Sequence, residues 1–244
     1  MKVIFNSVNK MFDNEAGLTN INLEIDKGII GLLGVNGAGK TTFLRLLTGF
    51  LIPNEGDVKV NNVFTKDRLF NLDNVGYISS EDDLPNSLTV KRFVSIFTSL
   101  NKDKKSNVKN IAKLLNFKLT SKKKIKELST GMKQKLKICL TLGYSRDIYL
   151  LDEPTIGLDP VASKLLSEFL KEIANDKIII YASHILEDIA NLCNKVIVIK
   201  ENEIFKNEDI SNWDELLSKQ MEIYYEFYSN NQKIKDIIDG AEDD

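Results

Sequence analysis

The chain has 244 residues, of which 43% are hydrophobic, and it carries a formal net charge of −2 at pH 7. This length is enough for one sizeable hydrophobic core, or for a core with a smaller lobe. Domains that bind nucleic acid are usually strongly basic, so the charge argues against that class and we expect no nucleic-acid partner.

The first half of the chain alternates short apolar strands with one helix and then becomes mainly helical. Gly49 is a typical C-terminal stop for the first helix, and the polar stretch 101–106 separates two amphipathic helices. From the apolar spacing we predict strands at 3–8, 21–25 and 28–34, a helix at 43–49, a turn and strand within 51–60, a strand at 75–80, and helices at 88–100 and 107–117.

The second half returns to strand–helix alternation. Asp159 is a good N-cap, and Pro160 after it suits the first position of a helix. The expected elements are a helix starting at Ser129, a strand ending at 153, a helix at 159–176, a strand at 177–183, a helix at 185–193, a hairpin at 195–205 and a helix starting at 211.

This order of elements predicts an α/β fold with a mainly parallel core sheet. The helical block at about 85–145 interrupts the alternation, and we interpret it as a lobe inserted into the core. We assign one domain to 1–210 and a C-terminal helix with an acidic tail to 211–244.

Cysteine usage and hydropathy indicate the compartment. Cys139 and Cys193 lie far apart and form neither a metal-ligand pair nor a disulfide framework, which indicates buried thiols in a reducing compartment. No apolar run approaches the length of a membrane span, and the first ten residues are too polar for a signal peptide. We expect a soluble, cytosolic protein; if it works at a membrane, another chain spans the bilayer.

A glycine-rich stretch, GVNGAGKT at 34–41, follows a buried strand and precedes a helix. This context matches the phosphate-binding loop of nucleoside triphosphatases, in which backbone N–H groups hold the α- and β-phosphates. We expect Lys40 to reach the β- and γ-phosphates and the Thr41 hydroxyl to bind Mg²⁺. A glycine-rich turn that matches by chance is the alternative. The residues expected to hold the nucleotide are Gly34, Asn36, Gly37, Ala38, Gly39, Lys40, Thr41 and Thr42.

The apolar strand IYLLDE ends in two carboxylates, Asp152 and Glu153. Adjacent side chains at a strand end point to different faces, so the two carboxylates can have different tasks. We assign Asp152 to the Mg²⁺ shell and Glu153 to aligning and deprotonating a water molecule. Read alone, the pair also fits an ordinary solvated strand end.

His184, in YASH, is the only histidine of the chain and stands just past a buried strand. Open α/β sheets bind their ligands at this end of the strands. We expect His184 to bond the γ-phosphate or to hold the attacking water. A purely structural histidine is the alternative.

A second anion-seeking helix start occurs in LSTGMKQKL, which begins at Leu128. Ser129 suits the N-cap, and Gly131 lets a ligand approach the backbone. The free N–H groups and the dipole of such a helix end attract anions. The chain therefore has two phosphate-seeking helix starts far apart in sequence.

In their order, GVNGAGKT, LSTGM, IYLLDEPTIGLDP and YASH resemble the ATP-binding domain of ABC transporters, over roughly residues 2 to 205. The resemblance implies a P-loop ATPase with an antiparallel β lobe, an inserted helical lobe, and ATP and Mg²⁺ as ligands. It also implies a head-to-tail dimer. In such a dimer, Ser129 and Gly131 of one subunit meet the γ-phosphate held by Lys40 of the partner subunit.

The resemblance assigns roles to two further residues. Phe12 occupies the place where the family stacks an aromatic ring on adenine, although an isolated Phe also suits a core. Asp159 matches the loop that crosses the dimer interface, and it is a plain helix N-cap at the same time.

Two positions depart from the family pattern. In the signature, Thr130 replaces the first Gly and Met132 replaces the usual Gln, which is similar to subunits that export drugs or antimicrobial peptides. After the strand VGYISS, the family has a Gln that touches Mg²⁺ and senses the membrane subunit. Ser80 stands there, followed by Glu81. We favour Ser80 as the residue that contacts the metal shell. The alternatives are that Glu81 takes over the role or that the loop has lost metal contact.

The resemblance implies an ATP-hydrolysing subunit that powers a separate transmembrane permease, as an exporter of a drug, peptide or lipid-like substrate. The partners are the permease and a second ATP-binding subunit, identical or different. The expected location is cytoplasmic and peripheral, on the inner face of the cell membrane. A soluble ABC ATPase of an assembly or regulatory process stays an alternative. A binding-only regulator is a third reading, against which the intact Lys40, Asp152, Glu153 and His184 argue.

Overall fold

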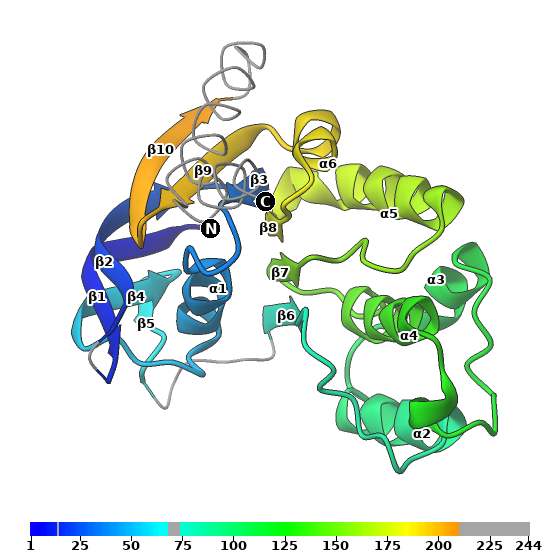
Figure 1. Cartoon of the computed structure of the whole chain (residues 1–244). Coiled ribbons are helices and arrows are strands. Elements are labelled where there is room, and N and C mark those ends of the chain that lie inside the picture. Colours follow the sequence, from blue (N-terminus) through cyan, green and yellow to red (C-terminus); the bar gives the residue numbers. More distant parts are fainter. Residues whose placement is uncertain (14, 68–73, 210–244) are drawn as a thin grey trace, which may run out of the picture. The chain divides into compact units, whose positions relative to one another are not determined.

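The computed structural model describes residues 1–13, 15–67 and 74–209 (Figure 1). All of these except Asp209 belong to one compact unit, Met1–Glu208. The predicted helix starting at 211 and the acidic tail lie outside the described residues, as does the predicted domain boundary at 210.

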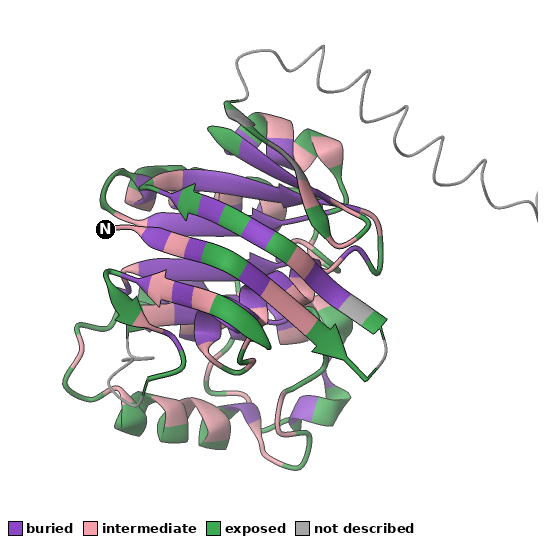
Figure 2. Cartoon of the chain, turned by 90° about the vertical axis from the view of Figure 1, so that its left-hand side faces the viewer, coloured by how far each residue is buried: buried purple, intermediate pink, exposed green. Residues whose placement is uncertain are grey.

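An antiparallel sheet of four strands is formed by the first part of the chain. Its order is β2-β1-β4-β5, and its strands are β1 (Val3–Phe12), β2 (Glu15–Ile25), β4 (Glu55–Val60) and β5 (Val63–Phe64). Buried and exposed side chains alternate along these strands (Figure 2), because one face of the sheet packs on the core. The strand predicted at 3–8 is longer in the structure, where β1 continues to Phe12.

The second sheet has six strands in the order β10-β9-β3-β8-β7-β6. They are β3 (Gly28–Leu33), β6 (Val75–Ile78), β7 (Ile148–Asp152), β8 (Ile178–Ala182), β9 (Lys195–Lys200) and β10 (Glu203–Asp209). Strands β9, β3, β8, β7 and β6 pair in parallel. Every residue of β7 and β8 is buried, as expected for parallel strands covered on both faces.

Helix α1 (Lys40–Thr48) contacts both sheets (Figure 1). The ring of Phe43 on α1 stacks on Phe5 of β1 at 4.5 Å between ring centres. One hydrophobic core therefore joins the antiparallel sheet, α1 and the parallel sheet. Gly49 ends α1 with φ +72, which confirms its prediction as a C-terminal stop.

The helices that follow β6 form the inserted lobe, and two more helices lie between the later strands. These helices are α2 (Val90–Leu100), α3 (Val108–Leu114), α4 (Thr130–Leu142), α5 (Pro160–Ile173) and α6 (Leu186–Leu192), with short 3₁₀ turns at Ile125–Glu127 and Ala174–Asp176. The side chains of Ser129 and Asp159 accept hydrogen bonds from N–H groups three residues on, which confirms both predicted N-caps.

The observed architecture confirms the predicted α/β fold, with a mainly parallel core sheet, an antiparallel lobe and an inserted helical lobe. Within the described part of the chain, none of the helices has the length and apolar character needed to cross a bilayer.

Candidate active site

Loops that follow β3, β6, β7 and β8 meet at one edge of the parallel sheet (Figure 1). The carboxyl ends of parallel strands open on the same side, where α/β sheets bind their ligands. Ser80, Glu153 and the loop before Lys40 line a common cavity of about 230 Å³, and His184 contacts Glu153. The topology thus brings together four predicted site residues that are distant in the sequence: Lys40, Ser80, Glu153 and His184.

The phosphate-binding loop connects β3 to α1, which begins at Lys40. Gly39 has φ +104, and a Cβ there would stand 2.6 Å from the carbonyl oxygen of Gly17, so only glycine fits. The predicted residues Gly34 and Ala38 do not line the cavity. The predicted nucleotide-binding residues that do line the cavity are Asn36, Gly37, Gly39, Lys40, Thr41 and Thr42.

The Lys40 side chain is buried within this loop. Its Nζ atom donates hydrogen bonds to the carbonyl oxygens of Gly34 at 2.6 Å and Val35 at 3.3 Å. Burial lowers the pKa of Lys40, against the opposing influence of the Glu153 and Asp152 carboxylates. A bound polyphosphate would supply the negative charge that a buried ammonium group favours.

Three side chains with oxygen atoms that can bind a metal ion, Thr41, Ser80 and Asp152, converge next to the loop. The hydroxyl of Thr41 donates to Oδ2 of Asp152 at 2.8 Å, and the hydroxyl of Ser80 donates to the same atom at 3.0 Å. Asp152 itself is only 1% exposed. No group of three or more His, Cys, Asp or Glu side chains that could cage a metal occurs among the described residues. One carboxylate with two hydroxyls instead suits Mg²⁺, which keeps waters and phosphate oxygens as its other ligands.

Glu153 is held in an unusual backbone conformation directly after β7. Its φ is +50, a left-handed value that is uncommon for a residue with a side chain. Oε1 of Glu153 lies 2.9 Å from Nδ1 of His184, whereas the buried Oε2 has no hydrogen-bond partner. The carboxylate is therefore oriented through one oxygen, and its second oxygen is buried without a hydrogen-bond donor.

His184 does not line the phosphate-loop cavity, and its side chain is 50% exposed. Its observed contact is with the predicted general base, a pairing that the sequence prediction did not include. The prediction that it bonds the γ-phosphate or the attacking water stays untested.

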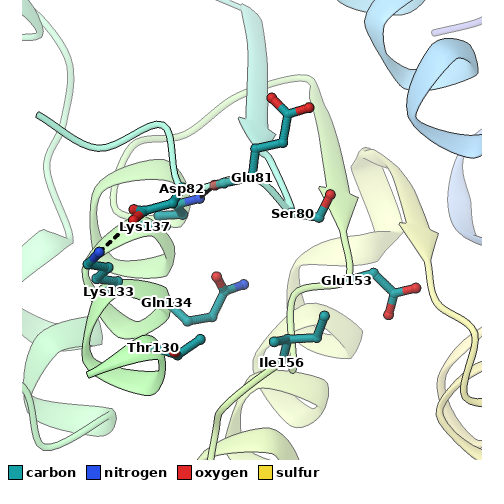
Figure 3. Close-up of a pocket in the computed structure, with 9 residues that line it drawn as sticks. All are labelled: Ser80, Glu81, Asp82, Thr130, Lys133, Gln134, Lys137, Glu153 and Ile156. Atoms are coloured by element: carbon teal, nitrogen blue, oxygen red, sulfur yellow. Dashed lines mark hydrogen bonds and ion pairs between the residues drawn. The ribbon is translucent and has the colours of Figure 1, made fainter. Parts of the chain in front are cut away.

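The loop after β6, residues 79–83, is called the acidic loop here. Each of its three carboxylates has a basic partner: Glu81 pairs with Arg45 at 2.6 Å, Asp82 with Lys133 at 2.6 Å, and Asp83 with Lys137 at 2.8 Å. Figure 3 shows the Glu81 carboxylate pointing away from Glu153. Since Ser80 contacts Asp152 and Glu81 contacts Arg45, the geometry favours Ser80 for the metal side.

Sequence reasoning missed Arg45, Lys133 and Lys137. The available signal was weak: Lys133 and Lys137 lie four residues apart, hence on one face of α4, and three consecutive acidic residues stand at 81–83. Nothing in that pattern distinguishes an anchored loop from a solvated charged surface.

The start of α4 is packed against the loop that follows Glu153. A Cβ at Gly131 would stand 2.0 Å from the carbonyl oxygen of Gly157, and Nε2 of Gln134 donates to the carbonyl oxygen of Pro154 at 2.8 Å. The expected space for a ligand at Gly131 is thus partly filled by the chain itself. Ser129 is exposed and, like Gly131, does not line the phosphate-loop cavity.

Phe12 and Asp159 lie on the surface of the unit. Phe12 is 42% exposed and covers Gly17, whose carbonyl oxygen adjoins Gly39 of the phosphate-binding loop. Phe12 is therefore a surface residue near this loop rather than a core residue, and its contact with adenine stays a prediction.

Asp159 has a lowered pKa. The main cause is the hydrogen bond from the Ala162 N–H group, and the second is the Lys135 ammonium group at 3.0 Å.

Several known proteins are similar to this chain. Residues 18–156 match the family described as ABC transporter. The ABC transporter ATP-binding protein NatA of Bacillus subtilis is 33% identical over 76% of this chain and 78% of its own length. The bacitracin transport ATP-binding protein BcrA of Bacillus licheniformis is 29% identical over 91% and 73% of the two chains.

A solved dimeric ATP-binding cassette in a post-hydrolysis state, bound to ADP and Pi, has the same fold. Its TM-score to this chain is 0.73 at 22% identity, and the match covers 86% of this chain and 99% of that one.

Proposed function

This chain belongs to the ABC transporter family as an ATP-binding subunit, and we propose that it hydrolyses ATP as a dimer to power export through a separate permease. The observation that carries the proposal is the meeting of Thr41, Ser80 and Asp152 beside the phosphate-binding loop, with Glu153 next to them.

The proposed chemistry divides among the named residues. Lys40 and the loop N–H groups would hold the phosphates of ATP, while Thr41, Asp152 and Ser80 would hold Mg²⁺. A metal ion bound there would supply positive charge for the phosphoryl group that is transferred. Glu153 takes the proton of the attacking water, and His184 keeps that carboxylate oriented.

A steady-state ATPase assay tests this division of roles. The purified chain should hydrolyse Mg-ATP, and Lys40→Ala should lose nucleotide binding together with turnover, because the buried cation is removed. Lys164→Ala, on the exposed surface of α5, is the matched control and should behave like the natural chain. Equal turnover by Lys40→Ala and the control would contradict the proposal.

Ser129 and Gly131 complete the site of the other subunit in the proposed dimer. Two features support this: neither residue lines the phosphate-loop cavity of its own chain, and the structural relative named above is dimeric. The arrangement explains why one chain carries two phosphate-seeking helix starts. Asp159, beside Lys135 of α4, then contributes to the interface.

Cysteines introduced at Ser129 and Gly37 test the composite site. ATP should promote a disulfide between two chains, and the single Ser129→Cys variant should form none. Background from the natural thiols is low, because burial raises the pKa of Cys139 to about 12 and also raises that of Cys193. A crosslink that forms only within one chain would contradict the head-to-tail dimer.

Export is supported by the relatives rather than by the site. BcrA is named as a bacitracin transport protein, and another relative, from Burkholderia pseudomallei, is named as a Nod factor export protein. We propose a drug, peptide or lipid-like cargo and a peripheral position on the inner face of the membrane. A tagged chain purified from native membranes in mild detergent should bring a multi-span permease with it. Recovery with soluble partners alone would favour the soluble ATPase.

A further inference from the structure

Lys137 of α4 contacts three residues of the acidic loop. It lies in the second half of α4, and its side chain is only 9% exposed. Its Nζ atom donates to the carbonyl oxygen of Ser79 at 2.9 Å and to the carbonyl oxygen of Glu81, and it pairs with Oδ1 of Asp83 at 2.8 Å. An ammonium group has three N–H bonds, so each one has an acceptor in this loop.

These contacts hold the backbone on both sides of one residue. The Ser79 carbonyl belongs to the peptide unit that joins residue 79 to Ser80, and the Glu81 carbonyl belongs to the peptide unit that follows Glu81, so the backbone is held on both sides of Ser80. The Ser80 hydroxyl lies 3.0 Å from Oδ2 of Asp152. A serine side chain is short, so a small shift of this backbone would take its hydroxyl out of reach of the metal side.

The carboxylates of the three ion pairs are about equally exposed, 60% for Glu81, 53% for Asp82 and 52% for Asp83, and ion pairs in such surroundings contribute little. Lys137 differs from the other two basic residues because it is the most buried of the three and donates to two backbone carbonyls. These backbone contacts make Lys137 the main anchor of the loop. Figure 3 shows Lys137 and Lys133 on α4 facing the loop that carries Ser80.

We propose that Lys137 is a positioning residue that ties the position of α4 to the reach of Ser80 at the metal side. The proposal rests on the function proposed above, in which Ser80 holds Mg²⁺. The same helix starts at the N-cap Ser129. A displacement of α4 caused by nucleotide at Ser129 is thus transmitted through Lys137 to the metal side of the subunit's own site. Lys137 and Ser80 together link α4 to the metal side, although the side chain at position 80 is short.

The test compares Lys137→Met with Lys133→Met. Both variants remove one positive charge and one ion pair between α4 and the acidic loop, but only Lys137 contacts the backbone carbonyls. Lys137→Met should raise the Mg²⁺ concentration for half-maximal ATPase activity about tenfold, as expected when a group that orients a metal ligand is lost. Its ATP affinity in EDTA should stay the same. Lys133→Met should leave the Mg²⁺ dependence unchanged.

A second comparison separates positioning from general stabilisation. In a Ser80→Ala background, Lys137→Met should cause no further change in Mg²⁺ dependence, because the side chain that it positions is gone. Asp83→Asn should have the natural Mg²⁺ dependence, since both carbonyl contacts remain. Independent, additive effects of Lys137→Met and Ser80→Ala would overturn the proposal. So would equal effects of Lys137→Met and Lys133→Met.

Folding and function are controlled separately. If Lys137→Met does not fold, Lys137→Gln keeps a hydrogen-bond donor and takes its place in both comparisons. If the natural chain lacks ATPase activity, the proposed function fails by itself. The Mg²⁺ dependence of thermal stabilisation by a non-hydrolysable ATP analogue then still measures the role of Lys137. An unchanged Mg²⁺ dependence in that assay would overturn the positioning role alone.

Discussion

Replacing Glu153 by Gln removes the proposed proton acceptor with little change in shape. The amide oxygen can still accept from His184 Nδ1, which lies 2.9 Å from Oε1 in the natural chain. The NH₂ group takes the place of the unpartnered Oε2 and cannot accept a proton. Backbone strain at φ +50 is the same for both residues, so the variant tests the chemistry of one oxygen atom.

The expected loss of turnover follows from the role of a general base. Such a group contributes about 10²- to 10⁴-fold, which corresponds to about 3–5 kcal/mol in the activation barrier. ATP affinity should be unchanged, because Lys40 and the loop glycines are untouched. Stability should rise slightly or stay equal, since a buried carboxylate oxygen without a partner is replaced by a neutral amide.

Three measurements check this prediction: steady-state ATP hydrolysis, nucleotide binding, and size-exclusion chromatography with ATP, which should reveal a trapped dimer. The control is His184→Ala, which keeps the carboxylate but removes its contact and should cost less turnover than Glu153→Gln. Hydrolysis by Glu153→Gln at nearly the natural rate, with a monomer in ATP, would refute the assignment of Glu153 as the base.

Three further predictions concern other parts of the site. Phe12→Ala should weaken ATP binding about tenfold through lost stacking, with Phe12→Trp restoring it, and an unchanged nucleotide titration would exclude adenine contact. Gly131→Ala should lower the free energy of unfolding by at least about 2 kcal/mol in urea titrations, because its Cβ would stand 2.0 Å from the Gly157 oxygen; Thr130→Ala should not. Asp159 has a lowered pKa, so it stabilises the fold above its unfolded pKa and loses this effect as pH falls through the folded value. Asp159→Asn should therefore reduce the loss of stability between neutral and acidic pH, and equal urea midpoints against pH for both chains would contradict this.

Features that depend on neighbouring residues were predictable from the sequence. The phosphate-binding loop is one example, because consecutive backbone N–H groups and the helix that follows form the whole cradle. The caps at Ser129 and Asp159 are others, since each side chain bonds an N–H group three residues on. The apolar strand before Asp152 and Glu153 was equally clear, because every residue of β7 is buried.

The pairing of side chains across the fold was decided by the tertiary structure. Ser80 and Asp152 are 72 residues apart, and Lys137 contacts the carbonyl group of Ser79 across 58 residues. A run of charged residues has the same appearance in sequence whether it is solvated or anchored. The sequence therefore favoured Ser80 over Glu81 only slightly, and the contacts of Lys137 and of Arg45 were not visible there. Sequence determined which chemical groups the chain carries and the order of most of its helices and strands. Only the folded sheet determined which groups meet, because hydrogen bonds and ion pairs depend on distances of a few ångströms that chain separation does not encode.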